Sequence, residues 1–258
     1  MGVYFRQDVE IPYLCFTANT TGSTIKLNKT WSPTAVTLET STDWSSWTTY
    51  TFGSTITLSN IWDKVYWRNT SETDTRFSTS VSDYYQFSMT WSVAWSGEVT
   101  TLLNKYNTDT LSDYCFFQLF NACSSLTSAP DLFSKILPQR CYDKMFQNCY
   151  NMTTPPIISA TTIWNYSCNL MFIYCSWLTK ISKIEATSIW TGWCQQMFLG
   201  CTSLKLSTSK GWNYQNEYII PALSVWTNWL NGMFTSTWGS FTWTPTAKTT
   251  YYTSNEVI

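Results

Sequence analysis

A repeat with a period of 26 residues constrains the fold of this chain more than any other feature of its sequence. Several columns of like side chains keep this step through four units. Three columns are Cys123, Cys149, Cys175 and Cys201; Phe120, Phe146, Phe172 and Phe198; and Leu126, Met152, Leu178 and Leu204. A further cysteine opens each unit, at Cys115, Cys141, Cys168 and Cys194. Because one unit cannot bury its own apolar side chains, the repeat predicts a stack of four units around a shared core.

Within one unit, the spacing of the apolar residues predicts a short helix. Apolar positions i, i+4, i+5 and i+8 are typical of a stripe along a two-turn helix. In the first unit these positions are Cys115, Leu119, Phe120 and Cys123. The segment 126–130 that follows suits a short extended piece that ends at Pro130.

Residues 12–100 show a different pattern, which is typical of β structure. Short stretches rich in Val, Ile, Thr, Tyr, Phe and Trp recur at roughly ten-residue spacing between turn-like clusters. The stretches are Tyr13–Phe16, Thr24–Leu27, Ala35–Leu38, Trp47–Phe52, Thr55–Leu58, Lys64–Trp67 and Tyr85–Trp91. Strands at this spacing predict an antiparallel sandwich or a small barrel.

The composition excludes several kinds of chemistry. The 258 residues include no histidine, which excludes Ser-His-Asp catalysis, Cys-His catalysis and His-ligated metal sites. Charged residues make up only 12% of the chain, and the formal charge is −1. This balance argues against binding along a nucleic-acid backbone. The carboxylates form no pair with a recognisable spacing, so we expect no catalytic residue, no metal and no cofactor.

The nine cysteines leave three interpretations open. They could pack in the core as small apolar side chains, form disulfides between neighbouring units, or bind a metal. The two cysteines of one unit do not have the C-x2-C spacing of zinc sites. On a helix they would stand about 10–12 Å apart, which is beyond the reach of a disulfide. We favour packing in the core.

Several segments resemble a known family of repeats. Segment 141–149 reads Cys-Tyr-Asp-Lys-Met-Phe-Gln-Asn-Cys, segment 123–130 reads Cys-Ser-Ser-Leu-Thr-Ser-Ala-Pro, and Ala-Thr connectors occur in 159–163 and 185–189. These segments resemble the cysteine-containing BspA-like leucine-rich repeats. Residues 13–68 look like the β module that often precedes such repeats, and the tail near 242–246 resembles their C-terminal cap. The resemblance implies adhesion or virion-surface roles rather than catalysis.

Pattern and resemblance together predict an α+β fold. We expect an N-terminal antiparallel β sandwich, a short leucine-rich-repeat solenoid of four 26-residue repeats and a β-type C-terminal cap. The expected boundaries are an N-terminal arm at 1–11, the β sandwich at 12–107, the solenoid at 108–206 and the cap at 207–258. We expect a partner chain to hold the arm.

Tryptophan stands at several turns where the resembled family places glycine. These residues are Trp31, Trp44, Trp62 and Trp91. A Trp side chain causes strain wherever φ must be positive. Three explanations stay open: the turns are of another type, the residues are recruited for contacts, or the codons differ, since Gly and Trp codons can differ by one base.

Other tryptophans are candidates for a binding surface, because exposed aromatic side chains with polar atoms are typical of interfaces. The candidate binding aromatics are Trp44, Trp47, Trp91 and Trp95 in the β part and Trp177, Trp190 and Trp193 in the repeat. Each could pack in the core, contact a protein or stack on a glycan. Low charge with many aromatics favours a wet, neutral binding surface over electrostatic steering.

The sequence thus predicts a non-enzymatic, surface-exposed binding or structural protein. Charged residues at 6, 8 and 10 stand where a secretory signal would have its apolar core. Together with the resemblance, this favours a bacteriophage virion decoration or fibre component that presents the repeat for host attachment. A bacterial cell-surface adhesin is the alternative, and a glycan-active enzyme a remote one. Expected partners are capsid or tail subunits, or a host surface protein or glycan. We expect a homo-oligomer without nucleic acid and without a membrane span.

Overall fold

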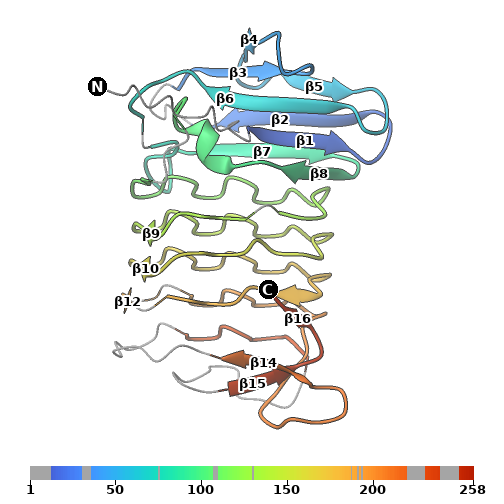
Figure 1. Cartoon of the computed structure of the whole chain (residues 1–258), viewed down its shortest axis with the longest axis vertical. Helices are drawn as coiled ribbons and strands as arrows, with labels where there is room; N and C mark the ends of the chain where they lie inside the picture. The colour runs from blue at the N-terminus through green and yellow to red at the C-terminus, as the bar shows by residue number, and fades with distance from the viewer. Residues whose placement is uncertain are drawn as a thin grey trace, which may run out of the picture.

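The computed structural model of this chain describes residues 13–30, 36–74, 76–106, 110–129, 131–186, 188–190, 192, 194–219, 230–238 and 250–258. A β module lies at one end of the long axis, and a stack of coils leads from it to the C-terminal strands (Figure 1). The expected arm at 1–11, Trp31, Trp193 and the segment 242–246 lie outside the described residues.

The β module consists of two antiparallel sheets. One has the strand order β4-β3-β6-β1-β8 and the other β5-β2-β7. The strands are β1 (Leu14–Ala18), β2 (Ser23–Lys29), β3 (Leu38–Ser41), β4 (Thr48–Thr49), β5 (Thr55–Leu58), β6 (Lys64–Asn69), β7 (Tyr85–Thr90) and β8 (Val93–Ser96), and the 3-10 helix η1 (Val99–Leu102) follows. The sheets meet at Phe87 of β7, whose ring contacts Phe16 of β1 at 5.0 Å and Trp67 of β6 at 5.1 Å between centroids.

Each coil of the stack contains a run of tight turns. Alternate amide groups form different hydrogen bonds: Phe117 N–H donates to the carbonyl of Tyr114 in its own coil (2.9 Å), whereas Phe116 N–H donates to the carbonyl of Cys141 in the next coil (2.9 Å). Every fourth residue of the run has a positive φ, as at Gln118 (55°) and Ala122 (61°). These left-handed residues end each turn and begin the next.

The expected α+β fold is wrong. Among the described residues there is one 3-10 helix, η1, and no α-helix, and the strands form several small sheets. The predicted helix is absent because an α-helix needs each N–H to reach the carbonyl four residues back, whereas here alternate N–H groups bond to the neighbouring coil. The sheets do not join around the stack, so the expected leucine-rich-repeat solenoid does not close either.

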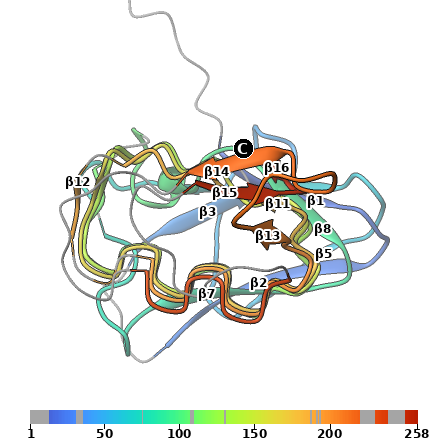
Figure 2. The same cartoon turned by 90° about the horizontal axis from the view of Figure 1, so that it is seen from below.

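Short parallel strands connect the coils at one edge, and an antiparallel sheet of β13, β15 and β14 lies at the C-terminal end of the stack. In the first group, β10 (Thr162–Ile163) pairs with β9 (Ile136–Leu137) and with β12 (Ser188–Ile189). The remaining strands are β11 (Lys180–Ile181), β13 (Leu206–Ser207), β14 (Asn216–Ile219), β15 (Thr250–Thr253) and β16 (Glu256–Val257). β16 returns to the stack and pairs in parallel with β11. Seen from below, the successive coils lie over one another (Figure 2).

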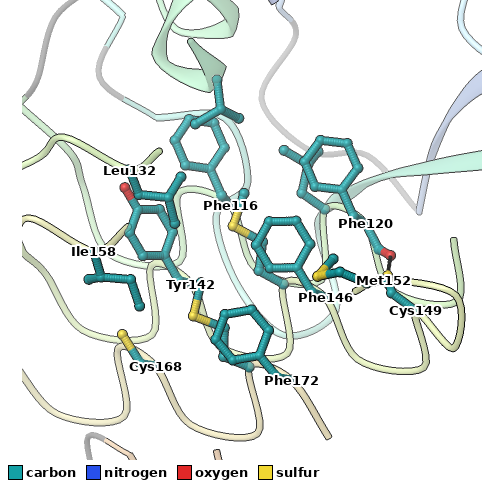
Figure 3. Packing of buried hydrophobic residues seen from close by; sticks show 14 of the residues in the cluster. Phe116, Phe120, Leu132, Tyr142, Phe146, Cys149, Met152, Ile158, Cys168 and Phe172 are labelled. Carbon is teal, nitrogen blue, oxygen red and sulfur yellow. Dashed lines mark hydrogen bonds between the residues drawn. The ribbon is translucent and has the colours of Figure 1, made fainter. Parts of the chain in front are cut away.

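A ladder of parallel phenylalanine rings runs through the core of the stack. Neighbouring rings lie 5.3–5.7 Å apart between centroids, and their planes differ by 5–12°. The six rings, in order, belong to Phe87, Phe120, Phe146, Phe172, Phe198 and Phe234. Figure 3 shows the middle of this ladder beside the buried Met152 and Cys149. The ladder starts in the β module, so β7 provides the surface on which the first coil stacks.

Edge-to-face rings end the ladder at both ends. At the N-terminal end, Phe16 and Trp67 contact Phe87 with interplanar angles of 67° and 90°. At the C-terminal end, Tyr218 and Tyr251 contact Phe234 at 77° and 64°. These perpendicular rings bury the outer faces of the ladder.

The second cysteine of each unit is buried and lies beside the ladder. Its thiol donates a hydrogen bond to the phenylalanine carbonyl of the preceding coil: Cys149 Sγ to Phe120 at 3.1 Å and Cys175 Sγ to Phe146 at 3.1 Å. Cys123 and Cys201 form the same contact. Cysteine suits this position because its small apolar side chain fits the core. Its thiol, a weak donor, also gives the buried phenylalanine carbonyl a second hydrogen-bond partner.

Candidate functional site

A groove of about 550 Å³ lies along one edge of the stack, between Trp91 and Trp177. Both indoles are exposed, Trp91 by 68% and Trp177 by 61%. The remaining lining residues are small or polar and carry no charge: Thr20, Ser92, Ser124, Ser125, Thr127, Asn151 and Thr153. The groove therefore combines aromatic surfaces with hydroxyl and amide groups and has a size typical of ligand sites.

Trp91 reaches the groove because a turn holds it there. It lies between β7 and β8 with a φ of 63°. Val93, two residues later, forms a parallel bridge with Leu126 of the first coil, and its N–H donates to the Ser125 carbonyl at 2.9 Å. The turn between β7 and β8 is thus in register with the edge of the coils.

Trp177 reaches the groove from the third coil. The buried Leu178 beside it anchors this edge in the core. A row of threonine amides keeps the register, since Thr153 N–H donates to the Thr127 carbonyl and Thr179 N–H to the Thr153 carbonyl, both at 3.0 Å. Three coil steps separate Trp91 from Trp177, or about 14 Å at the usual spacing of paired strands.

A second groove, of about 480 Å³, continues along the same edge towards the C-terminal end. It begins at Thr179, two residues beyond Trp177, and ends at Trp238, which is 65% exposed. Asn255 forms part of its wall: its side-chain amide donates to the carbonyls of Thr179 (2.8 Å) and Ser203 (3.2 Å). The floor is again neutral apart from Lys205.

Two further candidate aromatics, Trp44 and Trp47, lie together in a cluster of aromatic rings and line neither groove. Tyr13 contacts both indoles, at 5.1 and 5.0 Å between ring centroids. The guanidinium of Arg68 lies over the Trp47 ring at 4.0 Å and also pairs with Glu39 at 2.7 Å. The faces of this cluster are therefore already used by contacts within the chain.

The other two described candidates differ in exposure. Trp95 is buried and contacts Phe120 at 4.6 Å, so it belongs to the core. Trp190 is exposed and stacks on Trp164 at 5.4 Å; it directly follows β12 and lines neither groove. Only Trp91 and Trp177 among the described candidates line a groove together.

Three of the tryptophans at turns where the resemblance implies glycine have positive φ: Trp44 (67°), Trp62 (73°) and Trp91 (63°). These turns are therefore of the type that favours glycine, and the explanation by another turn type is wrong for them. Recruitment for contacts and a codon difference remain as explanations. Contacts account for Trp44, whose ring meets that of Tyr66 edge to face at 4.7 Å between centroids.

No protein family, curated protein or solved structure matches this chain. The resemblance to BspA-like repeats therefore stays a prediction. The described residues contain no helix that is long and apolar enough to cross a membrane.

The predicted core residues of the repeat are all buried. They are Cys115, Phe120, Cys123, Leu126, Cys141, Phe146, Cys149, Met152, Cys168, Phe172, Cys175, Leu178, Cys194, Phe198, Cys201 and Leu204. All nine cysteines of the chain are free thiols. Burial raises the pKa of Cys115 and of Cys175 to about 12, so neither is a nucleophile at neutral pH.

The titratable groups offer little for catalysis. Within the described ranges, no three His, Cys, Asp or Glu side chains gather as they would around a metal ion. Asp143 is a buried carboxylate, and burial raises its pKa. It pairs with Arg140 at 2.5 Å and accepts a hydrogen bond from Asn169 at 2.9 Å, so its role is structural. No carboxylate lines either groove along the edge.

Three residues were not singled out from the sequence: Phe87 and Phe234, which belong to the ring ladder, and Trp238, which lines the second groove. A signal for Phe234 existed, because Met233-Phe234 repeats the Met-Phe pair of three earlier units. It stands 36 rather than 26 residues after Phe198. The extra ten residues broke the period and concealed a further coil. Phe87 lies in a strand and carries no trace of the repeat.

Proposed function

We propose that this chain is a non-enzymatic binding protein that recognises neutral glycans through the groove between Trp91 and Trp177. The observation that carries the proposal is the lining of this groove, with two exposed indoles above a floor of uncharged hydroxyl and amide groups. The C–H-rich face of a pyranose packs on an indole, while its hydroxyl groups exchange hydrogen bonds with Ser, Thr and Asn side chains.

A protein partner is less well matched to this groove. Protein interfaces bury a central apolar cluster surrounded by a polar rim. Here the residues between the two indoles are Ser, Thr and Asn, and no large apolar side chain lies among them to form such a cluster. The absence of carboxylates from the lining favours binding over glycoside hydrolysis, which needs two of them. Whether the protein acts on a virion or on a bacterial cell surface stays a prediction.

The test is binding to soluble neutral polysaccharides by affinity electrophoresis and calorimetry, with laminarin, galactomannan, mannan and dextran as probes and heparin as a charged comparison. We expect at least one neutral polysaccharide to bind, and Trp91→Gly and Trp177→Ala each to weaken it tenfold or more, which is about 1.4 kcal/mol.

The matched control is Trp62→Gly, because Trp62 also has a positive φ and a 73% exposed indole but lies outside the groove. This variant should bind like the parent. Because a codon difference is one open explanation for tryptophan at this turn, peptide mass spectrometry of the protein from its native host is used to test whether residue 91 is tryptophan. Glycine at that position, or equal binding by Trp91→Gly and the parent, would contradict the proposal.

A further inference from the structure

The two grooves follow each other along one edge of the stack, and this arrangement suits an extended ligand. The first spans the β module and the first three coils, and ends at Trp177. The second begins at Thr179 and continues to Trp238. Because Trp177 and Thr179 belong to the same coil edge, no other coil separates the two grooves.

The coils place the exposed indoles along this edge three steps apart and then two steps apart. Trp238 forms a parallel bridge with Lys205, and the backbone N–H of Trp238 donates to the Leu204 carbonyl at 2.9 Å. Trp238 is therefore one coil beyond Lys205 and two beyond Trp177. Five coil steps separate Trp91 from Trp238, or about 24 Å at the spacing of paired strands.

The floor between these indoles carries a repeated set of hydroxyl groups. Thr127, Thr153 and Thr179 stand in one column, and the side chains of Thr153 and Thr179 each contact the threonine carbonyl of the coil before (3.3 and 3.2 Å). A ligand that runs along the axis of the stack meets a threonine side chain at each of these three steps, before Lys205 and Trp238 follow. A chain polymer with repeating hydroxyl groups matches such a surface better than a compact ligand does.

Resting on the proposed function, we infer that the ligand is a linear neutral glycan, which runs parallel to the axis of the stack and contacts Trp91, Trp177 and Trp238 in turn. The end of the chain need not be recognised, because both grooves are open along the edge. Lys205 is the one charged side chain in the linings of the two grooves, so uronic acids or sulfated sugars gain little there.

The experiment measures affinity by calorimetry for a ladder of oligosaccharides, disaccharide to decasaccharide, prepared from the neutral polysaccharide that binds. We expect affinity to rise with length beyond the size that fills one groove, by tenfold or more between tetrasaccharide and decasaccharide. Trp238→Ala should remove this gain. Trp190→Ala, which removes an exposed indole directly after β12 and outside both grooves, should keep it.

Three results would overturn the inference: affinity that reaches its maximum at the tetrasaccharide, a length dependence unchanged in Trp238→Ala, or a loss of the gain in Trp190→Ala. The first two leave the proposed function standing if Trp91→Gly still weakens binding. A lack of binding to every neutral polysaccharide instead contradicts both proposals.

Discussion

The backbone at Trp62 has a left-handed conformation that non-glycine residues rarely adopt (φ 73°). The strain costs about 1–2 kcal/mol relative to glycine. The Trp62 side chain is largely exposed, so it returns little packing energy in exchange. At Trp91 the same strain coincides with a groove, and at Trp44 with an edge-to-face contact to Tyr66. Backbone strain at Trp91 and Trp44 is thus accompanied by a groove or a ring contact, whereas at Trp62 it is not.

We predict that Trp62→Gly stabilises the protein by about 1 kcal/mol, because it relieves the strain and removes little buried surface. The free energy of unfolding in urea measures the effect. The control is Trp212→Gly, at a position that is even more exposed and is not among the residues with positive φ. We expect no increase in the free energy of unfolding for Trp212→Gly. A lower free energy of unfolding for Trp62→Gly would show that the Trp62 indole makes a stabilising contact.

At the scale of elements, the run of turns shows why a helix was predicted and why the prediction failed. The buried positions in the first coil recur every four residues, as at Cys115, Leu119 and Cys123. A helix has 3.6 residues per turn, so a short stretch cannot distinguish the two periods. The deciding factor is the partner of alternate N–H groups, which lies one coil away and leaves no local trace in the sequence. The β-rich character of 12–100 was easier to predict, because alternation of polar and apolar residues is local.

The site was only partly predictable for the same reason. Trp91 and Trp177 were candidates because of their residue type, but five other tryptophans had equal standing. What brings these two together is the register between the turn after β7 and the edges of the coils. That register depends on hydrogen bonds between distant segments, which composition and spacing do not encode.

We predict that removal of one complete coil, residues 146–171, leaves a folded protein. The deletion joins Met145 to Phe172, so the Met-Phe pair is retained and the bonds between coils keep their register. The control removes 146–169, two residues fewer, which shifts every later column. Circular dichroism and cooperative urea unfolding should show a folded first variant and an unfolded second one. Equal behaviour of the two would contradict the stacking in register.

At the scale of the whole molecule, the stack and the β module share a continuous core. Phe87 of the module stacks on Phe120 of the first coil at 5.3 Å, and Cys123 Sγ donates to the Phe87 carbonyl. The thiols that line this core are buried throughout, so they should become accessible only when the molecule unfolds as a unit.

We predict that a disulfide-exchange reagent at pH 8 modifies no thiol in the native protein and nine after denaturation, matching the nine free cysteines. The thiolate is the reacting form, and burial raises the pKa of all nine thiols, in Cys115 and Cys175 to about 12. A count below nine in denaturant that a reductant restores would reveal disulfides and contradict this description.

Edge-to-face rings close the phenylalanine ladder at its two ends. A column of parallel rings and parallel backbones has no intrinsic end, and a bare terminal coil would offer its unpaired groups to a second copy. Phe16 and Trp67 cover one end, and Tyr218 and Tyr251 cover the other. Among the described residues, the ladder therefore leaves no bare ring face on which a second copy could continue the stack.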